Sequence, residues 1–370
     1  MDSVLHTAVQ SLAVKIETLI ANARLQVAKV VNTAEVVTKY EIGRVIVEEI
    51  QDGAERATYG KKVLQGVSGI LTERLGGGWS VETLKKCRFF FQTYSNKNAV
   101  SNSVNTVDQI GFTHEVDTVK CNTGLNSVNT VYPIQQFSLS WSHYLVLMRI
   151  DNADERNFYE IECRKQNWSV RQLQRQYASS LYERLALSKE KDEVMRLANE
   201  GQIVEKPQDI LKNPVTLEFL GLKSESVYSE TKLESAIIGK LQQFLLEMGK
   251  GFLFEARQKR FSFNEKNFYV DLVLYNRLLQ CYILVDLKID ELTHQDLGQM
   301  QMYVNYYDRY QRQEWEKPTI GILLCKSKDD ALVELTLPKD SNIYAQEYAL
   351  YLPDKAVLQK KLAEWIEEER

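Results

Sequence analysis

The chain has 370 residues, of which 44% are hydrophobic and 26% charged, and it carries a net charge of −4. A chain of this length predicts two or three domains that bury ordinary hydrophobic cores. Because the net charge is slightly negative, any surface that binds nucleic acid must be a local patch. No run of about 18 apolar residues occurs, so the sequence predicts no membrane-spanning helix.

The cysteines do not have the spacing of a metal site. They are Cys87, Cys121, Cys163, Cys281 and Cys325, with no CxxC pair and no histidine at ligand spacing. A structural zinc site and a disulfide framework are therefore not expected. The N-terminal segment lacks a basic n-region and contains Lys15 and Glu17, which is not the pattern of a secretory signal. These features together predict a cytoplasmic protein.

Residues 1–95 have a helical pattern. Apolar residues recur at helical spacing within residues 35–51. A second helix is predicted over residues 61–75, where three consecutive glycines end it. A third is predicted over residues 81–94, capped by Ser80. A helix, a glycine turn and another helix are compatible with a helix-turn-helix arrangement.

Residues 96–135 differ from the rest of the chain, being rich in Asn, Ser, Thr and Val. Three copies of a Val-x-Thr-Val motif begin at Val104, Val116 and Val128. Three short, polar copies are too few to build the core of a solenoid, and long loops usually lie outside the core. The segment is therefore predicted to be a surface insertion that carries a repeat.

Helices are expected to resume after this insertion. One of them is predicted to begin at Ser169, because Ser169 and Gln172 have the spacing of a capping box. A charged stretch follows, and we place a domain boundary near residue 205. Residues 1–204 are then predicted to form a helical domain for nucleic-acid binding or assembly.

Residues 205–370 have the pattern of an α/β domain. Helices are predicted over residues 231–249, from Thr293 to about residue 313, and over residues 355–369, with strands over residues 252–255, 259–263, 268–274, 281–289, 320–324 and 342–348. This order is typical of a mixed sheet flanked by helices. The predicted fold class is a helical domain followed by an α/β domain.

Two charged residues lie in the apolar strand predicted over residues 281–289. Side chains alternate along a strand, so Asp286 and Lys288 share one face. As an exposed pair at a sheet edge they would contribute roughly 0–1 kcal/mol to stability. If buried, each ion would cost several kcal/mol to desolvate. Stability alone therefore does not explain the pair.

The preceding strand carries Asp271, and a hairpin would bring Asp271 and Asp286 together. Converging carboxylates repel each other unless a cation holds them, and hard oxygen ligands suit Mg²⁺ or Mn²⁺. Lys288 would then project beside a metal-bound water that attacks a phosphate. The pattern predicts a metal-dependent phosphodiesterase site.

Flanking helices add three candidates. Glu234 would be a further metal ligand, although an acid in the first turn of a helix is also a common dipole complement. Gln299 and Tyr303 are four residues apart and so lie on one helix face, pointing toward the metal site or a DNA phosphate. Ordinary core packing is the alternative for Tyr303.

Asp271 followed by Asp286-x-Lys288 resembles the PD-(D/E)xK phosphodiesterase motif, and Gln299-xxx-Tyr303 resembles the QxxxY extension of some of its nucleases. More closely, the chain resembles the YhcG-type nucleases in segments that include FLLEMGKGFLFEARQKRF, FYVDLVLYNRLLQCYILVDLKI and LTHQDLGQMQMYVNYYD. First-half segments such as YEIGRVIVEEIQ and WSVRQLQRQYASSLYERL extend the resemblance, whereas residues 96–135 depart from it.

The resemblance implies a helical N-terminal domain that binds nucleic acid, followed by a restriction-endonuclease-like domain. It implies that Asp271 and Asp286 bind the metal and that Lys288 is the catalytic lysine, with Glu234 as an extra ligand. Val270 stands where the motif name has proline, which is a common relaxation of the motif.

Basic residues on three segments are candidate DNA contacts, because lysine and arginine neutralise phosphates. These candidates are Lys85, Lys86, Arg88, Arg171, Arg175, Arg257, Lys259 and Arg260. The alternative for each is an ordinary solvated surface.

The first functional hypothesis is a Mg²⁺-dependent DNA endonuclease, active as a homodimer if it cuts both strands. The second is a catalytically silent DNA-binding or scaffold subunit of a restriction, defence or mobile-element system. Serine or cysteine hydrolase chemistry is poorly supported, because the four histidines have no evident nucleophile partner.

Overall fold

The computed structural model describes residues 2–53, 57–101, 137–189, 191–222, 228–338 and 340–367. It divides into two units, Met1–Asp151 and Asn152–Arg370. This division lies well before the boundary predicted near residue 205. No helix in the described ranges has the length and apolarity needed to cross a membrane.

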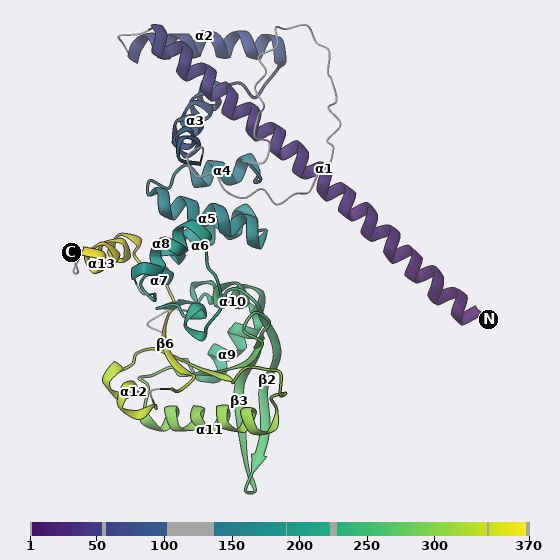
Figure 1. Ribbon diagram of the computed structural model, residues 1–370, viewed down its shortest axis with the longest axis vertical. Helices are drawn as coiled ribbons and strands as arrows, with labels where there is room; N and C mark the ends of the chain where they lie inside the picture. Colours follow the sequence, from purple (N-terminus) through teal and green to yellow (C-terminus); the bar gives the residue numbers. More distant parts are fainter. Residues whose placement is uncertain are drawn as a thin grey trace. The chain divides into compact units, whose positions relative to one another are not determined.

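The N-terminal unit consists of helices (Figure 1): α1 (Asp2–Gly53), α2 (Ala57–Leu75), α3 (Val81–Ser101) and α4 (Trp141–Leu147). Its core is aromatic, with Tyr40 of α1, Phe90 of α3 and Tyr144 of α4 gathered around Phe137. Gly43 lets α1 and α3 approach closely, since a Cβ atom there would lie 2.1 Å from the carbonyl oxygen of Cys87.

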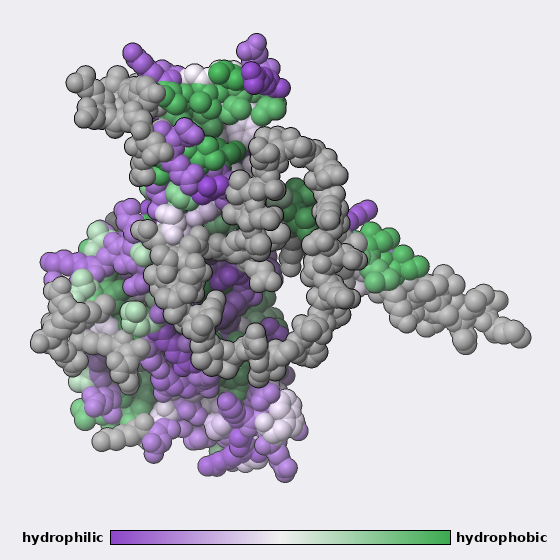
Figure 2. Space-filling view, turned by 45° about the horizontal axis from the view of Figure 1, so that its top comes forward, coloured by the Kyte–Doolittle hydropathy of each residue, from purple (hydrophilic) through white to green (hydrophobic). Residues whose placement is uncertain are grey.

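The helices of this unit are longer than predicted. α1 is a single helix of 52 residues, and its described N-terminal part exposes apolar side chains such as Leu19 and Val30 (Figure 2). α3 continues to Ser101, into the segment predicted as an insertion, and the rest of that insertion lies outside the described residues. The glycine turn between α2 and α3 is as expected, because Gly76 and Gly78 have positive φ angles.

The second unit begins with four helices: α5 (Ala153–Gln166), α6 (Val170–Ala178), α7 (Leu181–Ala186) and α8 (Lys191–Glu200). The capping box predicted for Ser169 and Gln172 is present at the start of α6. The helix predicted to begin at Ser169 ends at Ala178, and α7 starts after Ser180, whose φ of 53° lies in the left-handed region.

A six-stranded mixed sheet forms the centre of the second unit, in the order β1-β6-β5-β4-β3-β2. The strands are β1 (Val215–Thr216), β2 (Phe252–Phe263), β3 (Lys266–Asn276), β4 (Cys281–Leu287), β5 (Ile320–Cys325) and β6 (Ile343–Ala349). β2, β3 and β4 pair antiparallel, whereas β4, β5, β6 and β1 pair parallel. The predicted mixed sheet is confirmed.

Helices cover both faces of this sheet. α9 (Glu230–Gly239) and α10 (Leu241–Met248) pack on one face, and α11 (His294–Tyr310) packs on the other. Two further helices complete the unit: the short α12 (Asp330–Thr336) and the closing helix α13 (Lys355–Glu367). The alternating apolar residues of β4 supply both cores, as the period of a strand requires.

Two elements differ from their predicted form. The segments predicted as separate strands are one strand, β2, whose register with β3 shifts between Phe254 and Ala256. This shift is a β-bulge, which inserts one residue and bends the strand. The helix predicted over residues 231–249 is divided at Lys240, which has a φ of −126°.

A buried ion network attaches the helices α5–α8 to the sheet. Glu247 of α10 is fully buried and accepts hydrogen bonds from Arg184 of α7 at 2.5 Å and from Arg175 of α6 at 2.7 Å. Lys212 donates to its backbone carbonyl oxygen. Burial alone would raise the pKa of Glu247, but these three cations lower it overall. The network explains why the unit begins at Asn152 rather than near residue 205.

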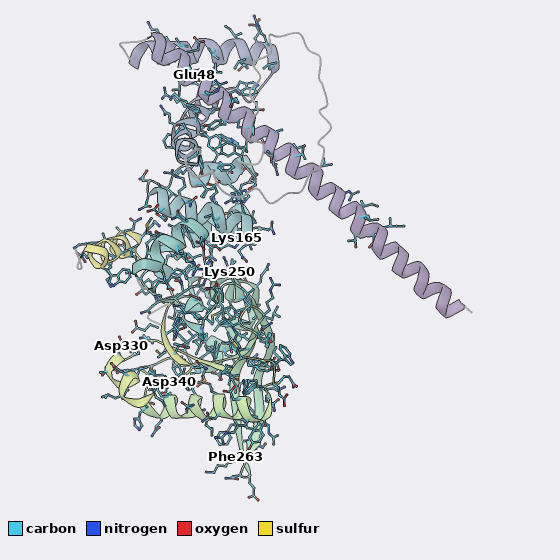
Figure 3. The ribbon with its side chains drawn as sticks, in the orientation of Figure 1. Glu48, Lys165, Lys250, Phe263, Asp330 and Asp340 are labelled. Atoms are coloured by element: carbon cyan, nitrogen blue, oxygen red, sulfur yellow. The ribbon has the colours of Figure 1, made fainter. Side chains whose placement is uncertain are left out.

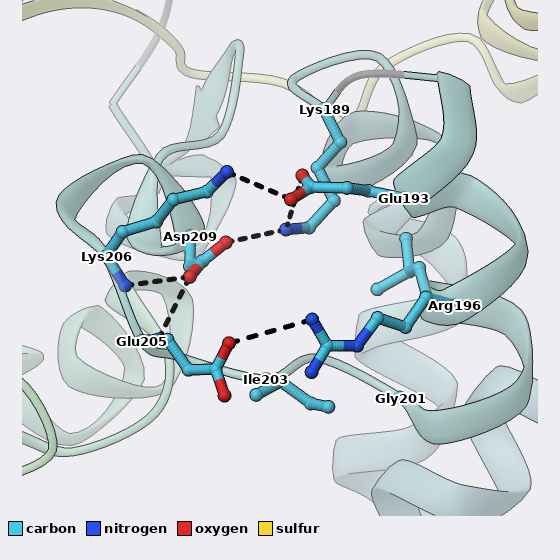
Figure 4. A pocket seen from close by; sticks show the side chains of 9 residues that line it. Lys189, Glu193, Arg196, Gly201, Ile203, Glu205, Lys206 and Asp209 are labelled. Atoms are coloured by element: carbon cyan, nitrogen blue, oxygen red, sulfur yellow. Dashed lines mark hydrogen bonds and ion pairs between the residues drawn. The ribbon is translucent and has the colours of Figure 1, made fainter.

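Smaller ion pairs hold the same helices in place. Lys250 donates to Glu162 of α5 at 2.7 Å, and Figure 3 labels Lys250 beside Lys165 of that helix. After α8, ion pairs surround a pocket of about 110 Å³, where Lys189 contacts Asp209 and Lys206 contacts Glu193 (Figure 4). The charges of these four residues compensate one another, so the pocket is a charge-balanced structural cluster.

Replacing Glu247 tests this network. Glu247→Gln leaves buried cations without their counter-charge, so we expect it to lower the free energy of unfolding by about 3–5 kcal/mol. The matched control is Glu364→Gln, which removes an exposed pair with Lys360 and should cost at most about 1 kcal/mol. Urea denaturation followed by circular dichroism measures both values. Equal effects of the two substitutions would contradict a structural role for the network.

Candidate active site

The site begins where β3 and β4 separate. Their antiparallel ladder ends at the pair Leu272↔Val285, so Asp271 and Asp286 are the next residues to face each other. At this point the backbone N–H of Leu287 donates to Oδ2 of Asp271 at 2.8 Å. A side chain thus replaces the next backbone partner, and the predicted convergence of the two acids is observed.

Asp286 lies in the interior of the sheet. β4 is paired with β3 on one side and β5 on the other, which excludes the alternative of a charged pair at a sheet edge. Asp286 is 3% exposed and shares the α11 face with Leu284. Its Oδ2 atom forms an ion pair with Nζ of Lys288 at 3.0 Å but has no hydrogen bond of good geometry in the described residues. This buried carboxylate oxygen can therefore still accept a hydrogen bond or bind a cation.

The environment opposes the charge on Asp286. Burial, followed by the nearby Asp271 carboxylate, raises the pKa of Asp286 to about 7, although Lys288 acts in the opposite direction. Burial and the charge of Asp271 together outweigh the effect of the Lys288 ammonium group. Without another cation, the carboxyl group of Asp286 therefore keeps its proton to an unusually high pH. Perturbed carboxyl groups of this kind cluster at functional sites.

Lys288 remains an ammonium group. Burial would lower the pKa of Lys288, but Asp286 raises it overall, with Glu230 and Asp296 adding to the effect. Asp296 lies 3.5 Å from Nζ and Glu230 lies 3.9 Å from it. The raised pKa keeps Lys288 charged at neutral pH, so its ammonium group can stabilise negative charge.

Gln299 and Tyr303 also belong to this region. Gln299 Nε2 donates to the hydroxyl oxygen of Tyr303, and Tyr303 is buried under the sheet. Burial raises the pKa of Tyr303, and the negative charges of Asp286 and Asp271 add to the shift. The tyrosine hydroxyl therefore lies near both acids and keeps its proton, which makes it a hydrogen-bond donor.

Glu234 lies beside the two acids but is joined to them indirectly. It is buried, and it accepts hydrogen bonds from Arg257 and from Nε2 of Gln258, the latter at 2.8 Å. Gln258 Nε2 also lies 2.8 Å from Oδ1 of Asp271. The side chain of Gln258 thus bridges the proposed extra ligand and the first acid.

Gln258 is held in an unusual conformation. Its φ of 47° lies in the left-handed region, which is uncommon for a non-glycine residue inside a strand. By the register of β2 and β3, Gln258 faces Asp271. Strained residues of this kind are concentrated at active sites. Gln258, Asp271 and Asp286 therefore form one row across three adjacent strands.

Three further residues, Glu230, Gln258 and Asp296, belong to this site and were not predicted from the sequence. Glu230 was detectable, because it precedes Glu234 by four residues and so shares its helix face. Asp296 was detectable as the third residue after the helix cap Thr293, and it completes a capping box there. Gln258 was not, because its position depends on the bulge in β2.

The candidate DNA contacts fall into two groups. Arg175 does not behave as predicted, because its guanidinium is used within the fold by Glu218, Glu247 and the carbonyl of Thr216. Arg257 is paired with Glu234. Exposed side chains remain at Lys85, Arg171, Lys259 and Arg260, whereas Lys86 and Arg88 are half-buried. Arg175 and Arg257 therefore have buried carboxylate partners that compete with a phosphate. Lys85 and Arg260 have only exposed partners, Glu82 at 3.7 Å and Asn267 at 3.1 Å.

The acids suit a hard divalent cation. Asp286 offers a buried oxygen without a hydrogen bond, and Asp271 faces it across the strand gap. Within the described residues, no group of three acid, histidine or cysteine side chains is arranged to hold a metal. Mg²⁺ commonly binds through one or two carboxylates, with water and substrate phosphate as its other ligands. The two acids fit that mode of binding.

Comparison with known proteins agrees with this geometry. The model of a family described as "YhcG PDDEXK nuclease domain" matches residues 208–363, and that of a "DUF1016 N-terminal domain" matches residues 15–184. The chain is 35% identical over 345 residues to the "Putative nuclease YhcG" of Escherichia coli (strain K12), which covers 93% of this chain and 91% of that protein.

Two solved structures are more distantly similar. A repair endonuclease from Pyrococcus abyssi is 19% identical with a TM-score of 0.23, covering 35% of this chain and 50% of its own. The structure described as "EndoMS-dsDNA2 complex" is 16% identical with a TM-score of 0.25, covering 36% of this chain and 50% of its own. This chain thus spans half of each of these proteins, and such scores support no inference about activity.

Two acids and a lysine at the open end of a mixed sheet, within a matching family domain, define a nuclease domain of the PDDEXK class. The chain belongs to the YhcG family of these nucleases, in which this domain follows the DUF1016 N-terminal domain.

The raised pKa of Asp286 makes a prediction for the metal-free protein. The folded state binds the proton of Asp286 more tightly than the unfolded state does. The stability of the folded protein is therefore highest, with respect to this group, below about pH 4, and it falls as the pH rises toward about 7. Asp286→Asn removes the charge, so in EDTA at pH 8 it should stabilise the protein by roughly 2–4 kcal/mol.

The measurement is urea denaturation at pH 4.5 and pH 8 in EDTA, with the exposed Asp340→Asn as control. The gain from Asp286→Asn should shrink at the lower pH, whereas Asp340→Asn should change stability little at either pH. A loss of stability at pH 8 would show that Asp286 is satisfied without a metal.

Proposed function

We propose that the protein is a divalent-metal-dependent endonuclease that hydrolyses phosphodiester bonds of DNA. The observation that carries this proposal is the pair Asp271 and Asp286, facing each other beside an ammonium group 3.0 Å from the second acid. A stable fold does not need two like charges at this place. A site that binds a cation and a phosphate does.

Each side chain has a distinct part in the proposed chemistry. Asp271 and Asp286 would hold Mg²⁺ or Mn²⁺, which lowers the pKa of a bound water and neutralises phosphate charge. Lys288, with its ammonium group 3.0 Å from Asp286, would stabilise the negative charge that develops on the reacting phosphate. Tyr303 accepts a hydrogen bond from Gln299, so its own O–H would be available to donate toward the same position. Glu234 and Gln258 fix the orientation of Asp271.

The helical N-terminal unit would contribute DNA binding. Lys85 is exposed on α3, and Lys86 and Arg88 lie on the same helix. In the second unit, Lys259 and Arg260 are exposed on β2, the strand that also carries Gln258. These residues would neutralise backbone phosphates, which positions a duplex without reading its sequence.

Cleavage assays test the proposed activity. Wild type should cut plasmid, branched or single-stranded DNA with Mg²⁺ or Mn²⁺ but not with EDTA. Asp286→Asn and Lys288→Ala should each lower the rate by about 100-fold or more, since each removes a group that acts on transition-state charge. Lys326→Ala, an exposed lysine, should retain the wild-type rate.

Equal nicking by wild type and Asp286→Asn would disprove the site assignment. Absence of cleavage of every DNA and RNA substrate, with tight DNA binding retained, would instead favour a silent DNA-binding subunit.

The bridge made by Gln258 has its own test. Gln258→Gly keeps the left-handed backbone without strain but removes both hydrogen bonds. We expect the cleavage rate or the apparent metal affinity to fall by about 10–100-fold, as is typical when a partner of a metal ligand is lost. DNA affinity in EDTA and thermal stability should be unchanged.

Gln280→Gly is a closely matched control, because Gln280 is exposed and also has a positive φ of 55°. If both variants lower the rate equally, the effect comes from the backbone and Gln258 is not a positioning residue.

A further inference from the structure

A second groove lies beside the proposed site, between the end of β2 and the outer face of α11. It encloses about 340 Å³, and its lining includes Phe261 and Phe263 of β2 with Tyr306 and Tyr310 of α11. The rings of Phe261 and Tyr306 are stacked, with centroids 4.1 Å apart, and Tyr310 lies 5.2 Å from Tyr306. Aromatic faces therefore make up much of the groove.

Much of this aromatic surface faces solvent. Phe263 is 51% exposed and Tyr310 is 63% exposed, and Figure 3 shows Phe263 near the end of the hairpin formed by β2 and β3. Neither ring closes a hydrophobic core, since neither belongs to the cores of the sheet. Large exposed aromatic groups gathered in one place usually mark a binding surface.

The polar groups around the groove favour a nucleic acid. Arg309 and Asn305 line it from α11 and are exposed, and Arg309 has no ion pair with a carboxylate in the described part of the chain. Lys259 shares the strand face of Phe261 and Phe263, because side chains alternate along β2. Positive charge thus accompanies the aromatic rings, as in surfaces that bind single strands.

Packed aromatic rings connect the lining of the groove to the proposed active site. Phe261 contacts Tyr306 in the groove and also packs edge-on against Tyr303, with centroids 5.5 Å apart. Along β2, Gln258 at the site and Phe263 at the groove are about 16 Å apart at 3.3 Å per residue. A nucleic-acid strand that passes the acids would therefore reach the groove within a few nucleotides.

We infer that this groove binds unpaired nucleotides of the substrate by stacking their bases on Phe263, Tyr306 and Tyr310. The inference rests on the proposed nuclease function and narrows its substrate to DNA with a single-stranded segment. The groove volume suits one or two bases. Nine residues line it, whereas a stable protein interface uses about 20–30 residues on each side. A second copy of the chain is thus a poorer occupant.

The test uses the double variant Phe263→Ala/Tyr310→Ala, whose rings are exposed and lie outside the two cores of the sheet. Binding is measured in EDTA by fluorescence anisotropy with a single-stranded oligonucleotide, a duplex with a single-stranded overhang, and a blunt duplex. The double variant should bind the first two about tenfold or more weakly and the blunt duplex with wild-type affinity. Tyr351→Ala, which removes an equally exposed tyrosine (63%), should bind all three like wild type.

Base stacking has a direct readout as well. Fluorescence of 2-aminopurine placed in the overhang should be quenched by wild type and by Tyr351→Ala, but less by the double variant. Equal losses of affinity on all three DNAs, or no loss relative to Tyr351→Ala, would overturn the inference. Loss of a dimer in sedimentation velocity with unchanged single-strand affinity would also overturn it, because the groove would then join two copies.

Failure of the proposed function has a different signature. If wild type cuts no substrate with Mg²⁺ or Mn²⁺ yet the double variant loses single-strand affinity, the groove is supported and the nuclease assignment fails. If wild type cuts and the double variant binds and cuts all three DNAs like wild type, only the groove inference fails.

Discussion

The separation of β3 from β4 after the pair Leu272↔Val285 is the constraint on which the site depends. From Leu272↔Val285 to Leu274↔Ile283, backbone groups of the two strands satisfy one another and the side chains are apolar. Where this pairing ends, the N–H of Leu287 needs another acceptor, and Asp271 provides it. The same hydrogen bond fixes Asp271 opposite Asp286, so the sheet itself creates the close approach of two carboxylates.

The burial of Asp286 then determines how readily its carboxyl group ionises. Asp286 lies on a central strand, where ionisation is costly and where Asp271 adds repulsion. The ammonium group of Lys288 reduces this cost without removing it, since the pKa of Asp286 is still raised. A site of this kind is destabilising when empty and is stabilised by what it binds, which is the usual relation between stability and function at catalytic residues.

The features that depend only on the spacing of residues within one strand or helix could be predicted from the sequence. Alternation along a strand placed Asp286 and Lys288 on one face, and helical spacing placed Gln299 beside Tyr303, without knowledge of distant contacts. Arg175 was misjudged because its partners Glu218 and Glu247 are 43 and 72 positions away along the chain. Gln258 could not be assigned, because one inserted residue in β2 decides which side chain faces Asp271.

The domain boundary has the same physical explanation. The two family domains meet between residues 184 and 208. Arg175 and Arg184, which belong to the first, are nevertheless the counter-ions of Glu247 in the second. A sequence module therefore ends inside a folded unit, because unpaired buried charges would be left if the chain were divided there.

This arrangement also gives the site a rigid support. Glu247 lies near the end of α10, and the chain continues after a short turn into β2, which carries Gln258. The helices α6 and α7 thus anchor the element that leads directly to the residue that orients Asp271. Catalytic groups must be held closely in position. The buried ion network therefore supports the open end of the sheet, although two of its members, Arg175 and Arg184, lie in the N-terminal family domain.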